Sequence, residues 1–275
     1  MLGWPVAHSR SPAMHNAALA ALGMSDWRYQ LLPVPPALFA QTARALPGSG
    51  FLGANVTIPH KQAALALATD SSRAAREIGA ANTLTFAADG AIAAENTDAP
   101  GLLAALEREL GSPAGLRALV LGAGGSARAA VWALREAGAE VTVWNRTRER
   151  ARALARELSV RAGDEVRAAD LLVNCTPVGL DAAAGVERSA SDREALNQLG
   201  MTFDQVGEYS YVVDLAYGSG PTHLLAAAAA HGARTIDGLE VLACQGALSL
   251  ELWTGREAPL EVMRAAARGL DAEPG

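Results

Sequence analysis

The segment from Leu119 to Arg150 reads LVLGAGGSARAAVWALREAGAEVTVWNRTRER, and it decides the fold class. A short apolar run leads into a glycine-rich turn, an alanine-rich stretch with helical periodicity follows, and Glu140–Trp144 has the pattern of a second strand. Two strands joined by a helix predict a parallel βαβ unit, because parallel strands need a crossover connection of this length. The segment therefore predicts part of an open α/β sheet.

The glycine-rich turn fits the pattern G-x-G-x-x-G/A, which is typical of dinucleotide-binding sites. The first glycine turns the chain tightly, the second lets the backbone approach a pyrophosphate, and the small third residue lets helix and strand pack closely. The helix N-terminus then offers free N–H groups to the anion. A glycine-rich loop without a ligand is the alternative, but the strand–turn–helix context favours a cofactor site. The predicted cofactor-binding residues of the turn are Gly122, Ala123, Gly124, Gly125, Ser126 and Ala127.

The residues after the second strand predict which dinucleotide binds. Proteins that bind NAD place Asp or Glu there, to hold the ribose 2′-hydroxyl. This chain has Asn145 followed by Arg146, and a guanidinium can bind a 2′-phosphate through two hydrogen bonds. Thr147 adds a hydroxyl and Arg150 adds charge. A solvated basic helix start is the alternative, but cations are disfavoured at a helix N-terminus without an anion. We therefore predict NADP as the cofactor, and an oxidoreductase.

The composition excludes several other classes of protein. The chain has 275 residues, half of them apolar, which suits one long domain or two ordinary ones. We expect no membrane association, because no uncharged apolar run is long enough to span a bilayer. Cys175 and Cys244 are too few for a disulfide framework, so we expect a cytoplasmic protein. The net charge of −6 argues against nucleic acid as a partner.

The predicted elements divide the chain into two domains. Residues 1–99 mix short strands with helices, and Asp89-Gly90 favours a hairpin. Residues 100–237 alternate strands with helices, which predicts a Rossmann-type parallel sheet with helices on both faces. Gly238–Gly269 is helical, and periodicity leaves open on which domain these helices pack. The predicted fold class is therefore α/β, with an N-terminal mixed α/β domain followed by a Rossmann-type domain.

The boundaries of the elements follow from periodicity and turn residues. The expected strands are Tyr29–Val34, Gly53–Ile58, Asn82–Phe86, Ala91–Ala94, Ala118–Leu121, Glu140–Trp144, Leu171–Asn174 and Val212–Leu215. The expected helices outside the tail are 13–22, Pro36–Ala45, Thr97–Leu110, Ala127–Ala137, Glu149–Glu157 and Thr222–His231, with another starting after Pro59. Residues 181–209 are small and polar, and we expect a loop or an insertion with a short helix there.

Lys61 is the only lysine in the chain, and every other residue in the total of 23 basic residues is arginine. A coding bias towards arginine explains the other positions. Arginine cannot release its proton near neutral pH, whereas lysine can. Lys61 is therefore a candidate for a proton-transfer task that arginine could not perform.

Three polar clusters lie outside the βαβ unit: Ser9–Pro12, Asn55–Lys61, and Asn82-Thr83 with Asn96–Asp98. Asn55 and Thr57 point to one face of a strand, and such hydroxyls and amides suit a polyhydroxylated ligand. Lys61 and Asp98 could form the proton-transfer pair that hydride transfer to or from an alcohol needs. Taken one at a time, these residues have a simpler interpretation. Ser, Thr and Asn commonly cap helices or form turns, and Lys61 could be a charged surface residue. The histidines show no metal-ligand spacing, so no metal is predicted.

The segment Gly3–Asn16 resembles the opening motif of the shikimate dehydrogenase family. Further segments resemble the other motifs of this family, in the same order along nearly the whole chain. Those that resemble its substrate motifs are Asn55–Lys61, Gly79–Thr83 and Asn96–Asp98, and those that resemble its NADP motifs are Gly122–Ala127 and Asn145–Thr147. The segments that resemble its C-terminal motifs are Asp214–Tyr217, Gly238–Gln245 and Leu252–Gly255.

The resemblance implies a reversible reaction between shikimate plus NADP and 3-dehydroshikimate plus NADPH, in chorismate and aromatic amino-acid biosynthesis. It assigns acid–base catalysis to Lys61 and places Asp98 at the reacting hydroxyl. It implies that residues 238–275 return to the N-terminal domain and complete a substrate-binding domain, leaving 100–237 to bind NADP. Asn55 is a further substrate candidate from its cluster. The substrate residues implied are Ser9, Ser11, Thr57, Asn82, Tyr217 and Gln245, and the further cofactor residues are Leu215 and Gly238.

Two alternatives remain open from the sequence. A related enzyme acting on quinate, with NAD or NADP, would share most of these motifs. Ser9 and Ser11 do not show whether the substrate is shikimate or quinate. A non-catalytic NADP(H)-binding sensor would need no acid–base pair, and the retention of both Lys61 and Asp98 argues against it. The expected partner is a small molecule, and the expected state is a monomer or a homodimer.

Overall fold

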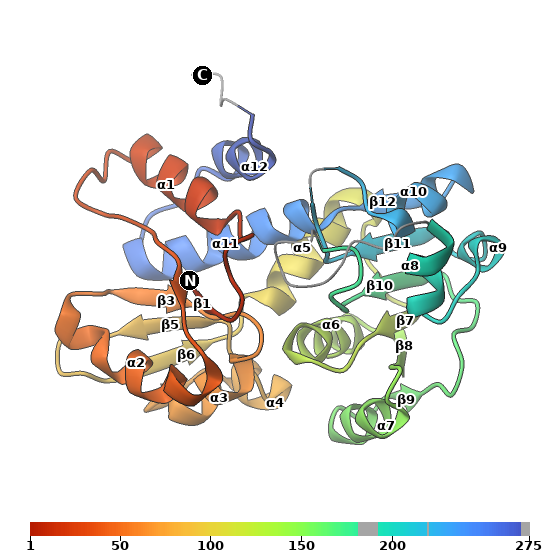
Figure 1. The fold of residues 1–275 in the computed structure, drawn as a ribbon, viewed down its shortest axis with the longest axis horizontal. Helices are drawn as coiled ribbons and strands as arrows, with labels where there is room; N and C mark the ends of the chain where they lie inside the picture. Colours follow the sequence, from red (N-terminus) through yellow and green to blue (C-terminus); the bar gives the residue numbers. More distant parts are fainter. Residues whose placement is uncertain (181–191, 219, 271–275) are drawn as a thin grey trace. The chain divides into compact units, whose positions relative to one another are not determined.

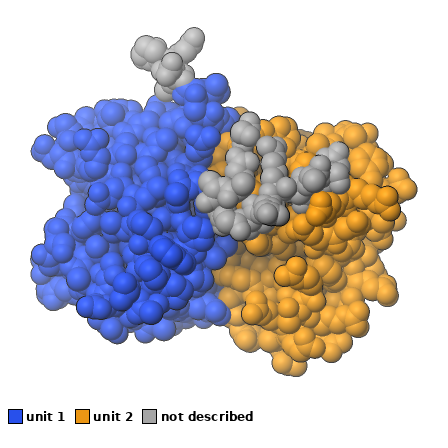
Figure 2. All heavy atoms as spheres, viewed as in Figure 1, with its two compact units in different colours: residues 1–101, 242–275 blue, residues 102–241 orange. Residues whose placement is uncertain are grey.

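The computed structural model describes residues 1–180, 192–218 and 220–270, and its chain forms two compact units. Residues 1–101 with 242–275 make unit 1, and residues 102–241 make unit 2 (Figure 2). The helices α5 (Asp98–Leu110) and α11 (Gly238–Thr254) each begin in one unit and end in the other. The predicted fold class is confirmed: an N-terminal mixed sheet, a Rossmann-type parallel sheet, and C-terminal helices that return to the first unit.

Unit 2 contains a six-stranded sheet in the order β12-β11-β10-β7-β8-β9, and every neighbouring pair is parallel. Counted along the chain from β7, this is the order 3-2-1-4-5-6 of Rossmann-type sheets. The strand order reverses between β7 and β10, where such sheets bind their ligands at the carboxyl ends of the strands. The strands are β7 (Arg117–Leu121), β8 (Glu140–Trp144), β9 (Arg161–Ala162), β10 (Leu171–Asn174), β11 (Tyr211–Asp214) and β12 (Arg234–Ile236).

Helices cover both faces of this sheet (Figure 1). The helices α6 (Gly125–Glu136) and α7 (Arg148–Glu157) pack on β7, β8 and β9. A second group packs together on β10 and β11, around the buried Leu172, Val212 and Leu224. Because both faces are covered, the strands β7, β10 and β11 are mostly apolar, whereas β8 keeps an alternating pattern. The second group is α8 (Asp192–Gln198), α9 (Phe203–Val206) and α10 (His223–Ala230).

Unit 1 contains a four-stranded sheet in the order β3-β5-β6-β4, and a parallel pair β1-β2 that joins it through a bridge from Leu2 to Val56. Figure 1 shows α2, α3 and α4 on one face of this sheet and α1, α11 and α12 on the other. The strands are β1 (Leu2–Gly3), β2 (Leu32–Pro33), β3 (Gly53–Asn55), β4 (Asp70–Ser71), β5 (Thr83–Phe86) and β6 (Ile92–Glu95). The helices are α1 (Ser11–Ala21), α2 (Phe39–Ala45), α3 (Lys61–Leu67), α4 (Arg73–Ile78) and α12 (Leu260–Arg268), with short 3-10 turns at Pro36–Leu38 and Pro47–Ser49.

The C-terminal helices pack closely on the N-terminal part of unit 1. A Cβ added at Gly101 would lie only 2.6 Å from the Cβ of Gln245, so glycine is needed where α5 meets α11. Gly246 likewise leaves room for Met14 of α1, and α12 packs along α1. Small residues at these contacts bring the backbones together, and this places α11 beside the polar clusters of the N-terminal strands.

The structure corrects several element boundaries. The strand expected at Tyr29–Val34 is only Leu32–Pro33, because the Asn16 side chain binds both the N–H and the carbonyl of Tyr29 and takes them out of any ladder. The strand expected at Gly53–Ile58 ends at Asn55, and α4, β4, β9 and β12 were not predicted. Of the irregular segment, residues 181–191 lie outside the described residues, and the remainder contains α8 and α9 rather than one short helix.

Candidate active site

Lys61 and Asp98 form a nearly buried ion pair in unit 1. Lys61 Nζ lies 2.5 Å from Asp98 Oδ2, and the two side chains are 9% and 19% exposed. Lys61 is the first residue of α3, after the turn at Ile58-Pro59 and the N-cap His60, and Asp98 is the first residue of α5. A carboxylate in the first turn of a helix is stabilised by the positive end of the helix dipole. The fold thus brings together a cationic and an anionic side chain whose residues lie far apart in the sequence.

The Asn82 side chain holds the other oxygen of Asp98. Its amide nitrogen donates to Asp98 Oδ1 at 2.9 Å, to Thr97 Oγ1 at 2.9 Å and towards Gln245 Oε1 at 3.0 Å. The backbone N–H of Thr97 lies 2.7 Å from Asn82 Oδ1. Because that N–H can only donate, the amide oxygen must take this side, and the amide nitrogen must face Asp98. Asp98 therefore accepts from Lys61 on one oxygen and from Asn82 on the other.

A group of buried polar side chains lies behind this pair. Asn55 donates to Ser249 Oγ at 2.8 Å and to Thr83 Oγ1 at 3.1 Å, and it accepts from the Tyr29 hydroxyl at 2.7 Å. Thr83 Oγ1 lies 3.1 Å from Thr97 Oγ1, which connects the group to Asn82. Asn55 is 2% exposed, so its amide lies within the protein's own network. Sequence reasoning had included Asn55 and Asn82 but missed Ser249 and Tyr29, for which no motif gave a signal.

Three predicted substrate residues lie at the start of α1 and after β3. The backbone N–H of Ser11 donates to Ser9 Oγ at 3.2 Å. The Ser11 hydroxyl is buried, and among the described residues it has no hydrogen-bond partner. The Thr57 methyl group lies beside Gly3, where an added Cβ would come within 2.5 Å of it. A buried hydroxyl without a partner is costly, and an anionic ligand oxygen would satisfy it.

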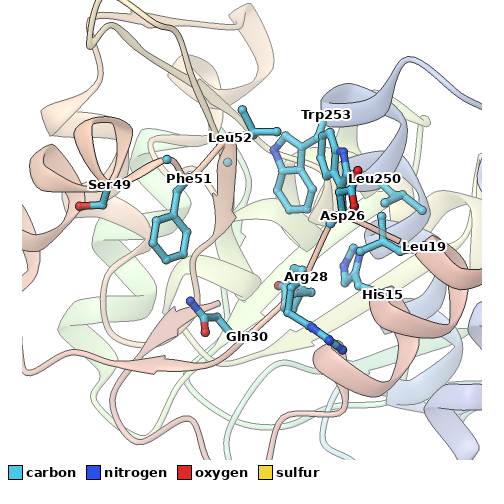
Figure 3. A pocket seen from close by; sticks show the side chains of 14 residues that line it. His15, Leu19, Asp26, Arg28, Gln30, Ser49, Phe51, Leu52, Leu250 and Trp253 are labelled. Atoms are coloured by element: carbon cyan, nitrogen blue, oxygen red, sulfur yellow. The ribbon is translucent and has the colours of Figure 1, made fainter. Parts of the chain in front are cut away.

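A cavity of about 350 Å³ lies within unit 1, and Tyr29 is one of the residues that line it (Figure 3). Its lining also includes Trp253, Phe51, Arg28 and His15. The His15 ring stacks on Tyr29 with centroids 4.2 Å apart. Burial, together with the nearby positive N-terminus, lowers the pKa of His15 to about 3, so its ring is neutral.

The glycine-rich loop of unit 2 has the geometry its sequence predicted. Gly122 adopts φ +113, a conformation that favours glycine, and its N–H donates to the Trp144 carbonyl at 2.8 Å. An added Cβ there would press on the Cys175 carbonyl at 3.2 Å. Gly124 caps α6 without a side chain, and open space lies where its Cβ would be. This open backbone at a helix N-terminus fits the pyrophosphate of a dinucleotide. The remaining loop residues are Ala123, Gly125 and Ser126, followed by the buried Ala127.

The candidate residues for the 2′-phosphate follow β8 at the same edge of the sheet. Asn145 donates to the Thr147 carbonyl at 3.0 Å, which shapes the turn into α7. Thr147 is the N-cap of α7, but its side chain makes no cap hydrogen bond. Arg146 and Arg150 are exposed, and in the described part of the chain neither forms an ion pair. Two exposed guanidinium groups and a hydroxyl at a helix start fit a phosphate.

The last predicted site residues lie after β11 and at the start of α11. An added Cβ at Gly238 would come within 2.5 Å of the Leu215 carbonyl oxygen, so glycine is required for this contact. Tyr217 is partly exposed in the segment after β11. It belongs to unit 2, whereas the other predicted substrate residues belong to unit 1.

Asp214, at the end of β11, carries a buried carboxyl group. Sequence reasoning did not predict that this group would join several elements. It accepts from Thr222 Oγ1 at 2.6 Å and from Asn174 Nδ2 at 2.8 Å. Burial raises the pKa of Asp214 to about 7, although these hydrogen bonds and one from the Ala216 N–H act in the opposite direction. The carboxyl ties β10, β11 and the N-cap of α10 together.

Metal-ligating clusters and membrane-spanning helices are absent from the described residues. In residues 1–180, 192–218 and 220–270, no group of three or more His, Cys, Asp or Glu is placed to hold a metal ion. Within those same ranges, no helix has the length and apolar character needed to span a bilayer.

The fold and site together define a class: α/β proteins that combine a Rossmann-type dinucleotide site with a separate unit carrying a buried Lys–Asp pair. Family models agree with this class along the chain. The models described as shikimate dehydrogenase substrate binding domain, shikimate / quinate 5-dehydrogenase and shikimate 5′-dehydrogenase C-terminal domain match residues 1–84, 104–177 and 238–268. The chain belongs to the shikimate dehydrogenase family.

Individual relatives match this chain over nearly its whole length. A shikimate dehydrogenase (NADP(+)) of Methanopyrus kandleri is 42% identical, over 97% of this chain and 93% of the relative. The crystal structure of a shikimate 5-dehydrogenase from Thermus thermophilus, in complex with NADP(H) and shikimate, has a TM-score of 0.82 and 42% identity, covering 98% of this chain and 97% of that one. A 5-ketofructose reductase of a Gluconobacter strain has a TM-score of 0.78 and 30% identity, covering 98% and 96%.

Proposed function

We propose that this chain catalyses the reversible, NADP(H)-linked interconversion of shikimate and 3-dehydroshikimate, a step in chorismate and aromatic amino-acid biosynthesis. The observation that carries the proposal is the Lys61–Asp98 ion pair, held among buried amides and hydroxyls. An alcohol–ketone interconversion by hydride transfer needs a group that exchanges a proton with the substrate oxygen, and this pair supplies one. Family membership and the named activity of close relatives support the same reaction.

Lys61 is the proposed acid–base residue. In the reducing direction its ammonium group donates a proton to the carbonyl oxygen, and in the oxidising direction the amine accepts the hydroxyl proton. Asp98 keeps the Lys61 amine in place and binds the same region of the substrate. The nicotinamide cofactor supplies or accepts the hydride when it is bound.

The remaining proposed roles follow from where the residues lie. Ser9 and Ser11 bind the substrate carboxylate through their hydroxyls, which is consistent with the unpartnered Ser11 oxygen. Thr57, Asn82, Gln245 and Tyr217 bind substrate hydroxyls, while Asn55 supports them from the interior. The proposed cofactor residues are Gly122, Ala123, Gly124, Gly125, Ser126, Ala127, Asn145, Arg146, Thr147, Arg150, Leu215 and Gly238.

The two domains have separate proposed tasks. Residues 1–99, completed by 238–275, bind the substrate and carry the acid–base pair. Residues 100–237 bind NADP. These boundaries differ by a few residues from the compact units of the structure, because α5 and α11 run from one unit into the other.

A steady-state assay with two acids and two cofactors tests the proposal. We expect the highest kcat/KM for shikimate with NADP. One of the matching family models covers both shikimate and quinate enzymes, so quinate is the competing substrate. Faster turnover of quinate with NAD would replace the proposed reaction with that of a quinate dehydrogenase. Binding of NADP without turnover of either acid would instead indicate a non-catalytic sensor.

Two further expectations accompany this function. The cysteine content supports a location in a reducing compartment, the cytoplasm. Size-exclusion chromatography with light scattering is expected to give a monomer or a homodimer. A larger assembly would contradict the second expectation without affecting the catalytic proposal.

A further inference from the structure

Ser249, on α11, lies at the centre of the buried polar group behind the ion pair. Its hydroxyl is fully buried and lies within hydrogen-bond distance of three side chains: Asn55 at 2.8 Å, Thr83 at 2.9 Å and Thr97 at 3.1 Å. It also donates to the carbonyl of Gln245 at 3.1 Å. No motif or family assignment described above gives this serine a role.

The donors and acceptors around Ser249 can be assigned by counting. A hydroxyl has one hydrogen and two lone pairs. The hydrogen goes to the Gln245 carbonyl, and one lone pair accepts from the Asn55 amide nitrogen, which can only donate. The second lone pair is then left for a threonine hydroxyl, and Thr83 at 2.9 Å is nearer than Thr97 at 3.1 Å, so we assign it to Thr83. Ser249 thus fixes the direction in which the Thr83 hydrogen points.

The direction of the Thr83 hydrogen matters for Asp98. Without Ser249, this hydrogen would turn to its other neighbours, Thr97 Oγ1 at 3.1 Å or Asn82 Oδ1 at 3.3 Å. Thr97 Oγ1 already accepts from the Asn82 amide nitrogen. A hydrogen bond from Thr83 to the second lone pair of that oxygen would draw it towards Thr83 and lengthen its hydrogen bond from the Asn82 amide that orients Asp98. Hydrogen bonds in such a buried network influence one another, because no water can replace a lost partner.

We propose that Ser249 is a positioning residue for the Lys61–Asp98 pair, acting through Thr83, Thr97 and Asn82. The proposal rests on the proposed function only for its kinetic consequences, because the geometry of the pair can be measured without a substrate. The network continues outward through Asn55 to the Tyr29 hydroxyl, so it spans unit 1 from the ion pair to the cavity wall.

Ser249→Ala is the variant that tests the proposal. The matched control is Thr254→Val, which also removes an α11 hydroxyl that donates to the carbonyl four residues earlier, but away from the network. With shikimate and NADP, we expect Ser249→Ala to lower kcat about tenfold and to change KM less than about threefold, the size expected for losing one buried hydrogen bond. We expect Thr254→Val to keep kcat within about twofold. Thermal unfolding of both variants checks that they fold.

The sole lysine provides a second measurement that needs no substrate. An amine-specific acylating reagent can modify only Lys61 and the N-terminal amine, and peptide mass spectrometry separates the two. We expect Lys61 of Ser249→Ala to react several-fold faster than in the unmodified protein, because its hold by Asp98 is loosened. Equal Lys61 labelling in Ser249→Ala, Thr254→Val and the unmodified protein would overturn the proposal. Lys61 of Ser249→Ala could also be labelled faster although the unmodified protein does not turn over shikimate. That result would support the positioning role of Ser249 and reject only the proposed function.

A double variant tests the route through Thr83. If the two hydroxyls act on one path, adding Thr83→Val to Ser249→Ala causes little further loss of kcat, because the misdirected hydrogen is then absent. A further loss as large as that of Thr83→Val alone would mean that the hydroxyls act independently. That result would overturn the assigned route.

Discussion

Single residues carry the proposed chemistry, and Lys61 is the clearest of them. We expect Lys61→Ala to lower kcat by about 10²–10⁴-fold, the usual contribution of a general acid–base group. The affinity for NADP should change little, because Lys61 lies in unit 1 and the glycine-rich loop in unit 2. Stopped-flow or steady-state kinetics and a fluorescence titration with NADPH measure the two effects. Arg44→Ala, which removes an exposed charge from α2, is the control. Near-normal turnover of Lys61→Ala would refute its role.

Arg146 is the residue proposed to distinguish NADP from NAD, two cofactors that differ by one phosphate. We expect Arg146→Ala to weaken NADP binding by at least about tenfold and to leave NAD binding nearly unchanged, because only the 2′-phosphate needs the guanidinium. Isothermal titration with each cofactor gives both affinities. Arg152→Ala serves as the control, since Arg152 forms an ion pair with Asp164 in the same helical region. An equal loss for both cofactors would mean that Arg146 does not recognise this phosphate.

At the scale of elements, Asp214 joins two strands and a helix, and its pKa of about 7 makes that junction pH-dependent. In the unfolded chain an aspartate has a pKa near ~3.9. Below about pH 4 the carboxyl is protonated in both states and contributes nothing. Between about pH 4 and 7 the unfolded chain loses the proton first, so this group lowers the free energy of unfolding as the pH rises. Above about pH 7 the carboxyl is ionised in both states, and its effect on the free energy of unfolding no longer changes with pH.

Asp214→Asn removes this titration while keeping most of the hydrogen bonds. We expect the variant to gain stability relative to the unmodified protein between about pH 4.5 and about pH 7.5, by up to a few kcal/mol, about 1.4 kcal/mol per unit of pKa difference. Urea unfolding at the two pH values measures the difference. A variant whose stability parallels that of the unmodified protein across this range would show that Asp214 is not protonated in the fold.

The elements also show what sequence patterns can predict. The strand at Glu140–Trp144 has the expected bounds, because alternation and a following turn are local properties. The strand expected at Tyr29–Val34 was too long, because a side chain from α1 binds the Tyr29 backbone. The short strands β4, β9 and β12 were missed. Two or three residues carry little periodicity, and their pairing partners come from elsewhere in the chain.

At the scale of the whole molecule, ligand binding should stabilise the fold through two separate sites. A ligand that binds only the folded state stabilises it by about 2.7 kcal/mol at a hundredfold excess over its Kd. For a chain of 275 residues, we expect the Tm to rise by several degrees with NADP. Shikimate should raise it independently. Differential scanning calorimetry with each ligand alone and together measures both effects.

The comparison with NAD sharpens this test. At the same concentration NAD should raise the Tm much less than NADP, because it lacks the phosphate expected at Arg146. An equal rise with both dinucleotides would contradict the cofactor assignment. A rise with NADP but none with shikimate would contradict the substrate assignment and leave the nucleotide site standing.

The sequence by itself determined the Rossmann-type half-site and its preference for a phosphorylated cofactor. Strand, glycine turn, helix and Arg146 all fall within Leu119–Arg150, so local periodicity and turn geometry specify them. Lys61 and Asp98 stood out by residue type and motif, but only the fold brings their charged atoms to 2.5 Å.

Only the tertiary structure decided what supports that pair. Ser249 lies 194 residues from Asn55 along the chain, and their hydrogen bond forms because small residues let α11 pack against the rest of unit 1. A serine in a helix has no periodic or motif signal that names its distant partners. Its neighbours are set by packing between distant segments, and no local pattern encodes that.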